Sequence, residues 1–221
     1  MNVELIDHMG SDLTVVNAAR VSFAKESEAF NDKDAKLINY LAREKHILPF
    51  RHPTISVRCK APIFLARQLG KHQVGLTWSE ESRRYIDSEP EFFFPDKWRK
   101  RAENVKQGSL DEEFTGYVET EEQHGVDRGP QEAAELAVQY CSDLYDDMIN
   151  AGVAPEQARM ILPQSMYVNW VWTGSLLAFY QLYKLRTEHG AQMEAQHFAN
   201  QLEAVVAPLY PASWAALKEY A

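Results

Sequence analysis

The chain has few cysteines, the residues that most often stabilise a fold through disulfides or structural metal ions. Its 221 residues include only two cysteines, Cys59 and Cys141, which form neither a CxxC pair nor a Cys/His ligand spacing. We therefore expect no disulfide framework and no metal site. Cys59 falls on an expected buried strand and Cys141 in an expected amphipathic helix, so both are predicted to be packing residues rather than nucleophiles.

Long hydrophobic runs and glycine motifs are also missing. No segment approaches about 18 continuous apolar residues, and the opening MNVELIDHMGSD has no basic start followed by an apolar stretch, so a reducing cytoplasm is the expected location. The glycines form neither GxGxxG nor GxxxxGKS/T, which leaves Rossmann and P-loop nucleotide sites unsupported. A net charge of -9 and a pI near 5.3 argue against a nucleic-acid polymer as partner.

The composition is that of one compact domain over residues 1–221, with 45% hydrophobic and 11% aromatic residues. Periodicity predicts helices over 12–20, 32–45, 131–151, 176–183 and 191–206, short helices starting at Pro62 and Pro155, and strands over 3–6, 54–59 and 166–173. A core stripe is expected from Leu37, Ile38, Tyr40 and Leu41. The helix over 131–151 is expected to be strongly amphipathic, with apolar residues near helical spacing at Ala134, Leu136, Ala137, Tyr140, Leu144 and Met148. The order of these elements is mixed rather than a run of βαβ units, which predicts a mixed α/β, or α+β, fold.

A polar excursion over about 98–130 interrupts this pattern. It is rich in charge and poor in aliphatic residues, which predicts a mobile surface segment or lid. The basic cluster at 97–101 has two interpretations, contact with a phosphate-bearing tail or, more simply, a solvated helix face.

The window 67–85, RQLGKHQVGLTWSEESRRY, reverses the sign of the overall charge. It holds four Lys or Arg residues against two acids, which favours a small anionic ligand, although a solvated surface turn has the same composition. Arginine forks bind phosphate or carboxylate oxygens, and a serine hydroxyl both donates and accepts. Gln68 and His72 lie four residues apart, so we expect them on one face of the helix that starts at Pro62.

The same window resembles the signature of the flavin-dependent thymidylate synthases, which reads Arg-His-Arg, seven or eight residues, then Ser-x-Arg-Tyr. The matching residues are Lys71-His72-Gln73, eight residues, then Ser82-Arg83-Arg84-Tyr85. Further segments are similar to that family in the correct order: 18–23 (AARVSF), His46 with 49–52 (PFRH), 60–64 (KAPIF), Ala158-Arg159, Leu162-Pro163, Trp172-Thr173, and Leu185-Arg186 with 191–194.

The resemblance implies the family's fold, an α+β domain with a mostly antiparallel sheet flanked by helices, and a homotetramer whose active sites are shared between subunits. It implies reductive methylation of dUMP at C5 to dTMP. The carbon would come from 5,10-methylenetetrahydrofolate and the hydride from FADH2, which NADPH recharges. No cysteine nucleophile would be needed.

The resemblance also carries over site residues. It implies dUMP binding by Gln68, Lys71, Glu80, Glu81, Ser82, Arg83, Arg84, Arg159 and Arg186. Arg186 and Ser82 are the implied catalytic residues, with Arg186 placing positive charge where negative charge develops on the uracil and Ser82 positioning the substrate. From the sequence alone, a salt bridge between Arg186 and Glu188 at a helix end is the alternative role.

For FAD, the resemblance implies Ser22, His46, Lys71, His72, Gln73, Glu80, Ser175 and Gln181. Lys71 and Gln73 stand where the family has arginines, so this chain lacks both bidentate forks of the first triplet. Two other classes therefore stay open: a non-catalytic nucleotide- or flavin-binding relative, and a flavoenzyme that transfers a one-carbon unit to another pyrimidine nucleotide. The aromatic run from Tyr167 to Tyr183 would supply core, flavin pocket or subunit interface.

Overall fold

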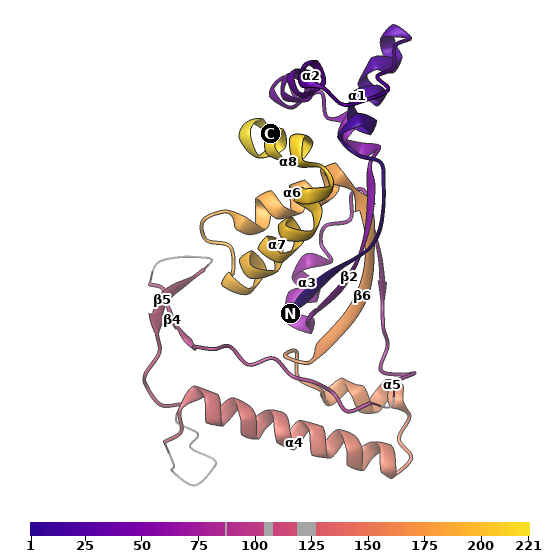
Figure 1. Cartoon of the computed structure of the whole chain (residues 1–221). Helices are drawn as coiled ribbons and strands as arrows, with labels where there is room; N and C mark the ends of the chain where they lie inside the picture. Colours follow the sequence, from indigo (N-terminus) through magenta and orange to yellow (C-terminus); the bar gives the residue numbers. More distant parts are fainter. Residues whose placement is uncertain (87, 104–107, 119–126) are drawn as a thin grey trace. The chain divides into compact units, whose positions relative to one another are not determined.

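The chain folds into two compact units, each built from stretches that are separate in sequence. The structure is a computed structural model and describes residues 1–86, 88–103, 108–118 and 127–221 (Figure 1). Unit 1 comprises Met1–Lys60, Arg67–Glu80 and Asn169–Ala221, and unit 2 comprises Ala61–Ala66 and Glu81–Val168. The chain thus passes from unit 1 to unit 2 between Glu80 and Glu81, inside the signature window.

Unit 1 is organised around a sheet. Its strands lie in the order β1 (Asn2–Met9), β2 (Thr54–Pro62), β6 (Tyr167–Ser175) and β3 (Leu76–Glu80). The pairs β1–β2 and β3–β6 are antiparallel. β2 and β6 also run in opposite directions, because Leu176 N donates to Pro53 O and the Ser56 and Thr173 hydroxyls lie 2.8 Å apart. The expectation of a mixed fold with an antiparallel sheet flanked by helices is confirmed.

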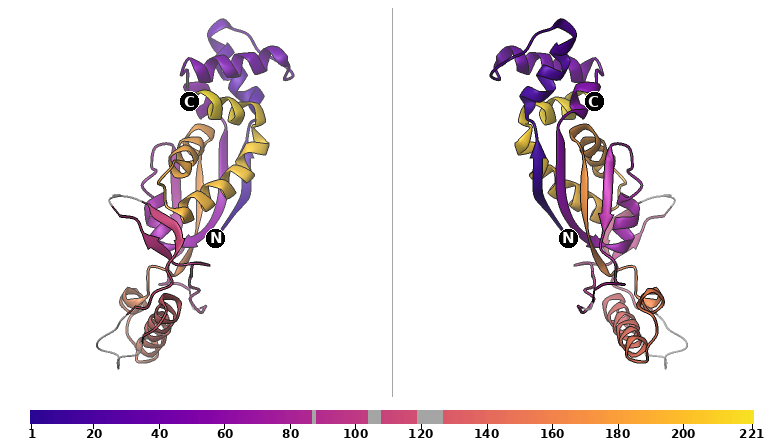
Figure 2. Two further views of the ribbon diagram at one scale, coloured as in Figure 1. Left: turned by 90° about the vertical axis from the view of Figure 1, so that its left-hand side faces the viewer. Right: turned by 90° about the vertical axis from the view of Figure 1, so that its right-hand side faces the viewer.

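Side chains alternate on this sheet, as a half-buried strand requires. The buried face of β2 carries Ile55, Val57 and Cys59, and that of β6 carries Trp170 and Trp172. Helices α6 (Leu176–Thr187) and α7 (Met193–Val206) cover that face (Figures 1 and 2). Four members of the aromatic run between 167 and 183, namely Trp170, Trp172, Phe179 and Tyr180, are core residues.

A buried ion pair holds the start of unit 1 together. Helix α1 (Asp12–Arg20) is followed by the 3-10 turn η1 (Val21–Phe23) and by α2 (Asp32–Arg43). Asp34 is fully buried and accepts from Arg20 Nη2 at 2.6 Å, from Ser27 Oγ at 3.2 Å and from the Asn31 backbone at 3.0 Å. These bonds anchor both ends of the segment that carries Ser22.

A carboxylate from the first helix caps the N-terminus of the last helix of unit 1, α8 (Pro211–Tyr220). The two oxygens of Asp12 accept from Ala212 N at 2.9 Å and from Ser213 N at 2.8 Å. Tyr210 donates its hydroxyl to the Met9 carbonyl at 3.1 Å. Because the first N–H groups of a helix lack intrahelical partners, Asp12 is a non-local cap for α8.

Unit 2 contains α4 (Pro130–Asn150), α5 (Pro155–Ala158), the 3-10 turn η3 (Arg159–Ile161) and the antiparallel pair β4 (Arg99–Arg101) and β5 (Ser109–Glu113). The predicted helix face at 97–101 is therefore wrong, since this part is a strand. Its lysines pair with acids across the ribbon, Lys97 with Asp111 at 2.5 Å and Lys100 with Glu112. Part of the predicted mobile excursion, residues 104–107 and 119–126, lies outside the described residues.

Several other expectations are corrected. Tyr40 is 45% exposed, so this member of the predicted core stripe is not core. On the amphipathic helix α4, Leu136 and Tyr140 are 47% and 70% exposed. Helix α3 (Ile63–Leu69) ends before His72, so Gln68 and His72 do not share a helix face. The signature window contains the strand β3, which was not predicted and which pairs with β6.

Candidate active site

Arg186 is held at the end of α6 by two acceptors of unit 1. Its Nε donates to His72 Nε2 at 3.0 Å and its Nη2 donates to the Gln68 backbone carbonyl at 3.2 Å. Gln68 is close to the end of α3, where carbonyl groups lack intrahelical partners, and a cation is favourable at that end of a helix. These contacts replace the Glu188 salt bridge that the sequence left open.

His72 is half-buried and neutral. Burial and the Arg186 charge lower the pKa of His72 to about 4. Because Arg186 Nε is only a donor, His72 Nε2 is the acceptor and the ring proton is on Nδ1. Burial also lowers the pKa of Arg186, although guanidinium groups stay charged in proteins.

The turn that carries Lys71, His72 and Gln73 is fixed at both ends. His72 N donates to Leu69 O at 2.9 Å, and Ser175 N donates to Gly75 O at 3.2 Å. A Cβ at Gly174 would lie 2.4 Å from that same Gly75 oxygen, so only glycine allows this close approach of the two backbones. Ser175 itself caps α6, because Ala178 N donates to its hydroxyl at 3.3 Å.

Glu80 ends β3 beside an aromatic stack. The indole Nε1 of Trp78 donates to Glu80 Oε2 at 3.1 Å. Trp78 stacks on Trp170 with a centroid distance of 4.2 Å and also meets Trp172 edge-on at 5.0 Å. The sequence analysis did not single out Trp78; its signal was the indole two residues before Glu80, which places both side chains on one face of the strand.

Two arginines converge on one hydroxyl in unit 2. Ser82 Oγ accepts from Arg159 Nη1 at 3.1 Å and from Arg84 Nε at 3.2 Å, while Arg84 also lies over the Tyr85 ring at 4.9 Å. Tyr85 N donates to Ser82 O at 2.9 Å, which closes the turn. Two exposed guanidinium groups that share a neutral hydroxyl have the chemistry suited to an anion. We call Ser82, Arg84 and Arg159 the arginine cluster.

The remaining predicted nucleotide residues lie as follows. Arg83 does not join the arginine cluster; its guanidinium lies 5.7 Å from the centre of the Tyr145 ring and its Nε is buried without a hydrogen-bond partner. Glu81 is half-buried in unit 2. Gln68, Lys71, Glu80 and Arg186 belong to unit 1.

All the predicted FAD residues belong to unit 1. Ser22 lies on η1 and His46 follows α2, where its ring meets Tyr40 edge-on at 5.8 Å. Lys71, Gln73 and Gln181 are exposed.

One buried acceptor of unit 1 has no hydrogen-bond partner among the described residues. The side-chain oxygen of Gln68 is buried without a hydrogen-bond partner, beside the carbonyl that holds Arg186. An imide N–H of a flavin or a uracil would satisfy this oxygen, since a buried acceptor normally has a partner.

Neither cysteine is arranged as a nucleophile. Cys59 is fully buried on β2 and burial raises the pKa of its thiol, so the reactive thiolate is disfavoured. Cys141 is a half-buried free thiol of α4. The prediction that both pack rather than react agrees with these positions.

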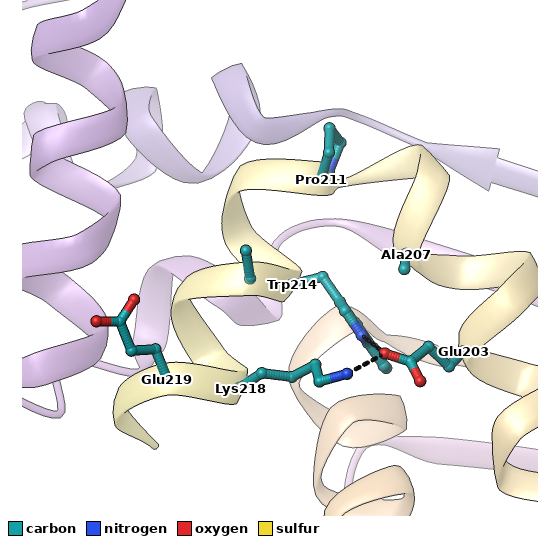
Figure 3. Close-up of a pocket in the computed structure, with 7 residues that line it drawn as sticks. Glu203, Ala207, Pro211, Trp214, Lys218 and Glu219 are labelled. Atoms are coloured by element: carbon teal, nitrogen blue, oxygen red, sulfur yellow. Dashed lines mark hydrogen bonds and ion pairs between the residues drawn. The ribbon is translucent and has the colours of Figure 1, made fainter.

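A cavity of about 550 Å³ lies where α7, the 3-10 turn η4 (Ala207–Leu209) and α8 meet, and sequence reasoning did not find it (Figure 3). Glu203 lines it and accepts from Trp214 Nε1 at 2.9 Å and Lys218 Nζ at 2.6 Å. The predicted site residues do not line this cavity. Within the described ranges, no cluster of three His, Cys, Asp or Glu residues suited to a metal ion is found, and no helix is long and apolar enough to cross a membrane.

Comparison with solved structures identifies proteins that share this fold. The structure matches that of a UMP/dUMP methylase from Streptomyces cacaoi bound with 5-Br dUMP, with a TM-score of 0.82 and 30% identity over 99% of this chain and 95% of the other. The same class of methylase bound with 5-Br UMP matches with a TM-score of 0.78.

The family follows from sequence relatives. Residues 4–212 match the family model described as thymidylate synthase complementing protein. A flavin-dependent thymidylate synthase of Thermus thermophilus is 34% identical over 99% of this chain and 76% of its own, and one of Thermosipho africanus is 32% identical over 99% and 91%. The chain belongs to the flavin-dependent thymidylate synthase family.

Proposed function

We propose that the protein methylates dUMP at C5 to give dTMP, with 5,10-methylenetetrahydrofolate as the carbon donor. Bound FAD, reduced by NADPH, would supply the hydride that takes the transferred carbon to the methyl level. The observation that carries the proposal is the fixed Arg186 guanidinium, whose Nε and Nη2 bond His72 and Gln68. Its other N–H groups remain to hold the uracil and to stabilise negative charge on the ring, so no cysteine adduct is required.

The arginine cluster is assigned to the phosphate of dUMP. Arg84 and Arg159 each present a planar guanidinium suited to phosphate oxygens. Both donate to the Ser82 hydroxyl, which lies between them. Gln68, Lys71, Glu80, Glu81 and Arg83 complete the assigned nucleotide set. The residues that would hold FAD are Ser22, His46, Lys71, His72, Gln73, Glu80, Ser175 and Gln181.

The proposal includes assembly as a homotetramer with shared active sites and one synthase domain per chain. The family match runs through both units without a break, which supports the single domain. Leu136 and Tyr140 on α4 leave apolar surface exposed, which supports a subunit contact. Two free thiols suit a reducing cytoplasm.

A cysteine-free variant tests the function. Cys59→Ala with Cys141→Ser is expected to convert dUMP to dTMP with FAD, NADPH and methylenetetrahydrofolate at a rate within about threefold of the wild type, because neither thiol reacts. Mass spectrometry of the nucleotide product measures this. The substrate UMP is included because one structural relative is a UMP/dUMP methylase. Loss of methylation in the FAD-binding variant alone would show that a cysteine takes part. Absence of dUMP methylation by the wild type would overturn the proposed function, and methylation of UMP alone would move it to the ribonucleotide.

The phosphate assignment makes a second prediction. Arg159→Ala should weaken dUMP binding to the FAD-loaded protein about 10- to 100-fold, since a hydrogen bond to a charged group contributes about 1.5–3 kcal/mol. Arg128→Ala is the matched control, because Arg128 pairs with Glu132 on the same unit at 3.2 Å and is outside the arginine cluster. Titration calorimetry gives both dissociation constants, and equal values would rule out the assigned role of Arg159.

A further inference from the structure

The orientation of Arg186 depends on one ring nitrogen. In a guanidinium, Nε–H and one Nη2–H form one edge, and the second Nη2–H with Nη1 forms the next. Arg186 uses the first edge for His72 Nε2 and for the Gln68 carbonyl. The second edge therefore keeps the paired geometry that suits two oxygens in a plane.

Building on the proposed function, we propose that His72 is a positioning residue, whose Nε2 lone pair fixes the Arg186 guanidinium and so leaves its other edge for the uracil. The bond joins residues 114 apart in the sequence, on the turn after α3 and in the last turn of α6. Gln68 alone would leave the guanidinium free to rotate about its single remaining hydrogen bond.

The support for His72 is itself rigid. Its backbone N donates to Leu69 O, and the turn ends at Gly75, whose carbonyl contacts the backbone at Gly174 and Ser175. A backbone held in this way limits the positions open to the His72 ring, which favours a pre-organised site.

The charge state of His72 agrees with this role. Protonation would remove the Nε2 acceptor and place a second cation beside Arg186. Because the pKa of His72 is lowered to about 4, the acceptor is present at neutral pH. The Nδ1–H then remains as the ring donor for any other contact, including one with the flavin.

Two amide variants distinguish the loss of the hydrogen-bond acceptor at His72 from the loss of the imidazole ring itself. Glutamine at this position carries its side-chain oxygen where His72 Nε2 stands, whereas asparagine is one bond too short. We expect His72→Asn to lower kcat about tenfold to a hundredfold with KM for dUMP nearly unchanged, and His72→Gln to recover most of the rate. Equal rates for the two variants, whether high or low, would overturn the positioning role.

A measurement without turnover distinguishes this proposal from the proposed function. NMR of FAD-loaded protein labelled with ¹⁵N-histidine makes this measurement, and the signal missing from His72→Gln is that of His72. We expect this signal to show a proton on Nδ1 and a neutral ring down to about pH 5. Replacing Arg186 by leucine should raise the pKa of His72 but leave it below 6.5, the ordinary value, because burial, the larger cause of the low pKa, remains. A proton on Nε2, or titration near that value in the wild type, would overturn the inference even if dTMP forms. The expected spectra without any dTMP would instead refute the proposed function.

Discussion

Replacing Arg186 by alanine is expected to lower the rate of dTMP formation about 100- to 1,000-fold, the usual effect of removing one donor that stabilises negative charge in a transition state. Arg186 is held through Nε and Nη2 in unit 1, so its charge is available without reorganisation. Lysine keeps the charge but lacks the planar fork, and Arg186→Lys should fall between alanine and the wild type. Single-turnover assays with product quantification measure these rates.

The control for this prediction lies two residues upstream on the same helix. Lys184 is exposed and donates to the Ala221 carbonyl at 2.5 Å, so Lys184→Ala should turn over like the wild type. Losing the contact with Gln68 costs about 1 kcal/mol of stability, and a thermal melt shows whether Arg186→Ala stays folded. A rate for folded Arg186→Ala close to that of Lys184→Ala would contradict the catalytic assignment.

Removing the carboxylate of Asp34 is expected to destabilise unit 1 strongly. Asp34→Ala leaves Arg20 without its partner and removes the acceptor for Ser27 and for the Asn31 backbone. Breaking a buried ion pair from one side costs about 3–5 kcal/mol, and the low end applies because Arg20 is one quarter exposed. For a chain of this size, 3 kcal/mol lowers Tm by roughly 6–12 °C.

Asp32 provides the comparison, since it is an exposed acid in the first turn of the same helix. Asp32→Ala should cost under about 1 kcal/mol, the contribution of one charge to a helix end. Calorimetry on both variants separates the buried pair from the general effect of charge. If the two variants melt at the same temperature, the ion pair contributes little to folding.

The helices and the sheet were predictable where local signals agreed with burial. α1 has the predicted bounds because Ser11 caps it and an apolar stripe follows. β3 was missed because its alternating signal, with Leu76 and Trp78 on one face, is only five residues long, and pairing with β6 places Trp78 opposite Trp172. α4 was predicted as an amphipathic helix, but the exposure of Leu136 and Tyr140 was not predictable, since a pattern identifies an apolar face without showing what covers it.

The candidate site also contains residues that the sequence identified and contacts that it did not. The resemblance selected Ser82, Arg84 and Arg159, and the structure brings their side chains into hydrogen-bonding contact. The bond from Arg186 to His72 had no local signal, because the partners come from separate elements and the nearer charge, Glu188, was the obvious choice. Trp78 was missed for a similar reason, since its stacking on Trp170 depends on strand register.

The cap that Asp12 gives to α8 bears on the order in which unit 1 forms. The carboxylate and the Ala212 amide that it accepts from are 200 residues apart, so this contact has to wait until the last helix has been synthesised. The first strand, β1, packs on α7, which is also synthesised late. Contacts of such long sequence separation slow folding and expose apolar strands meanwhile. A ribosome-bound chain that stops before α7 should therefore bind chaperones more readily than one released at full length.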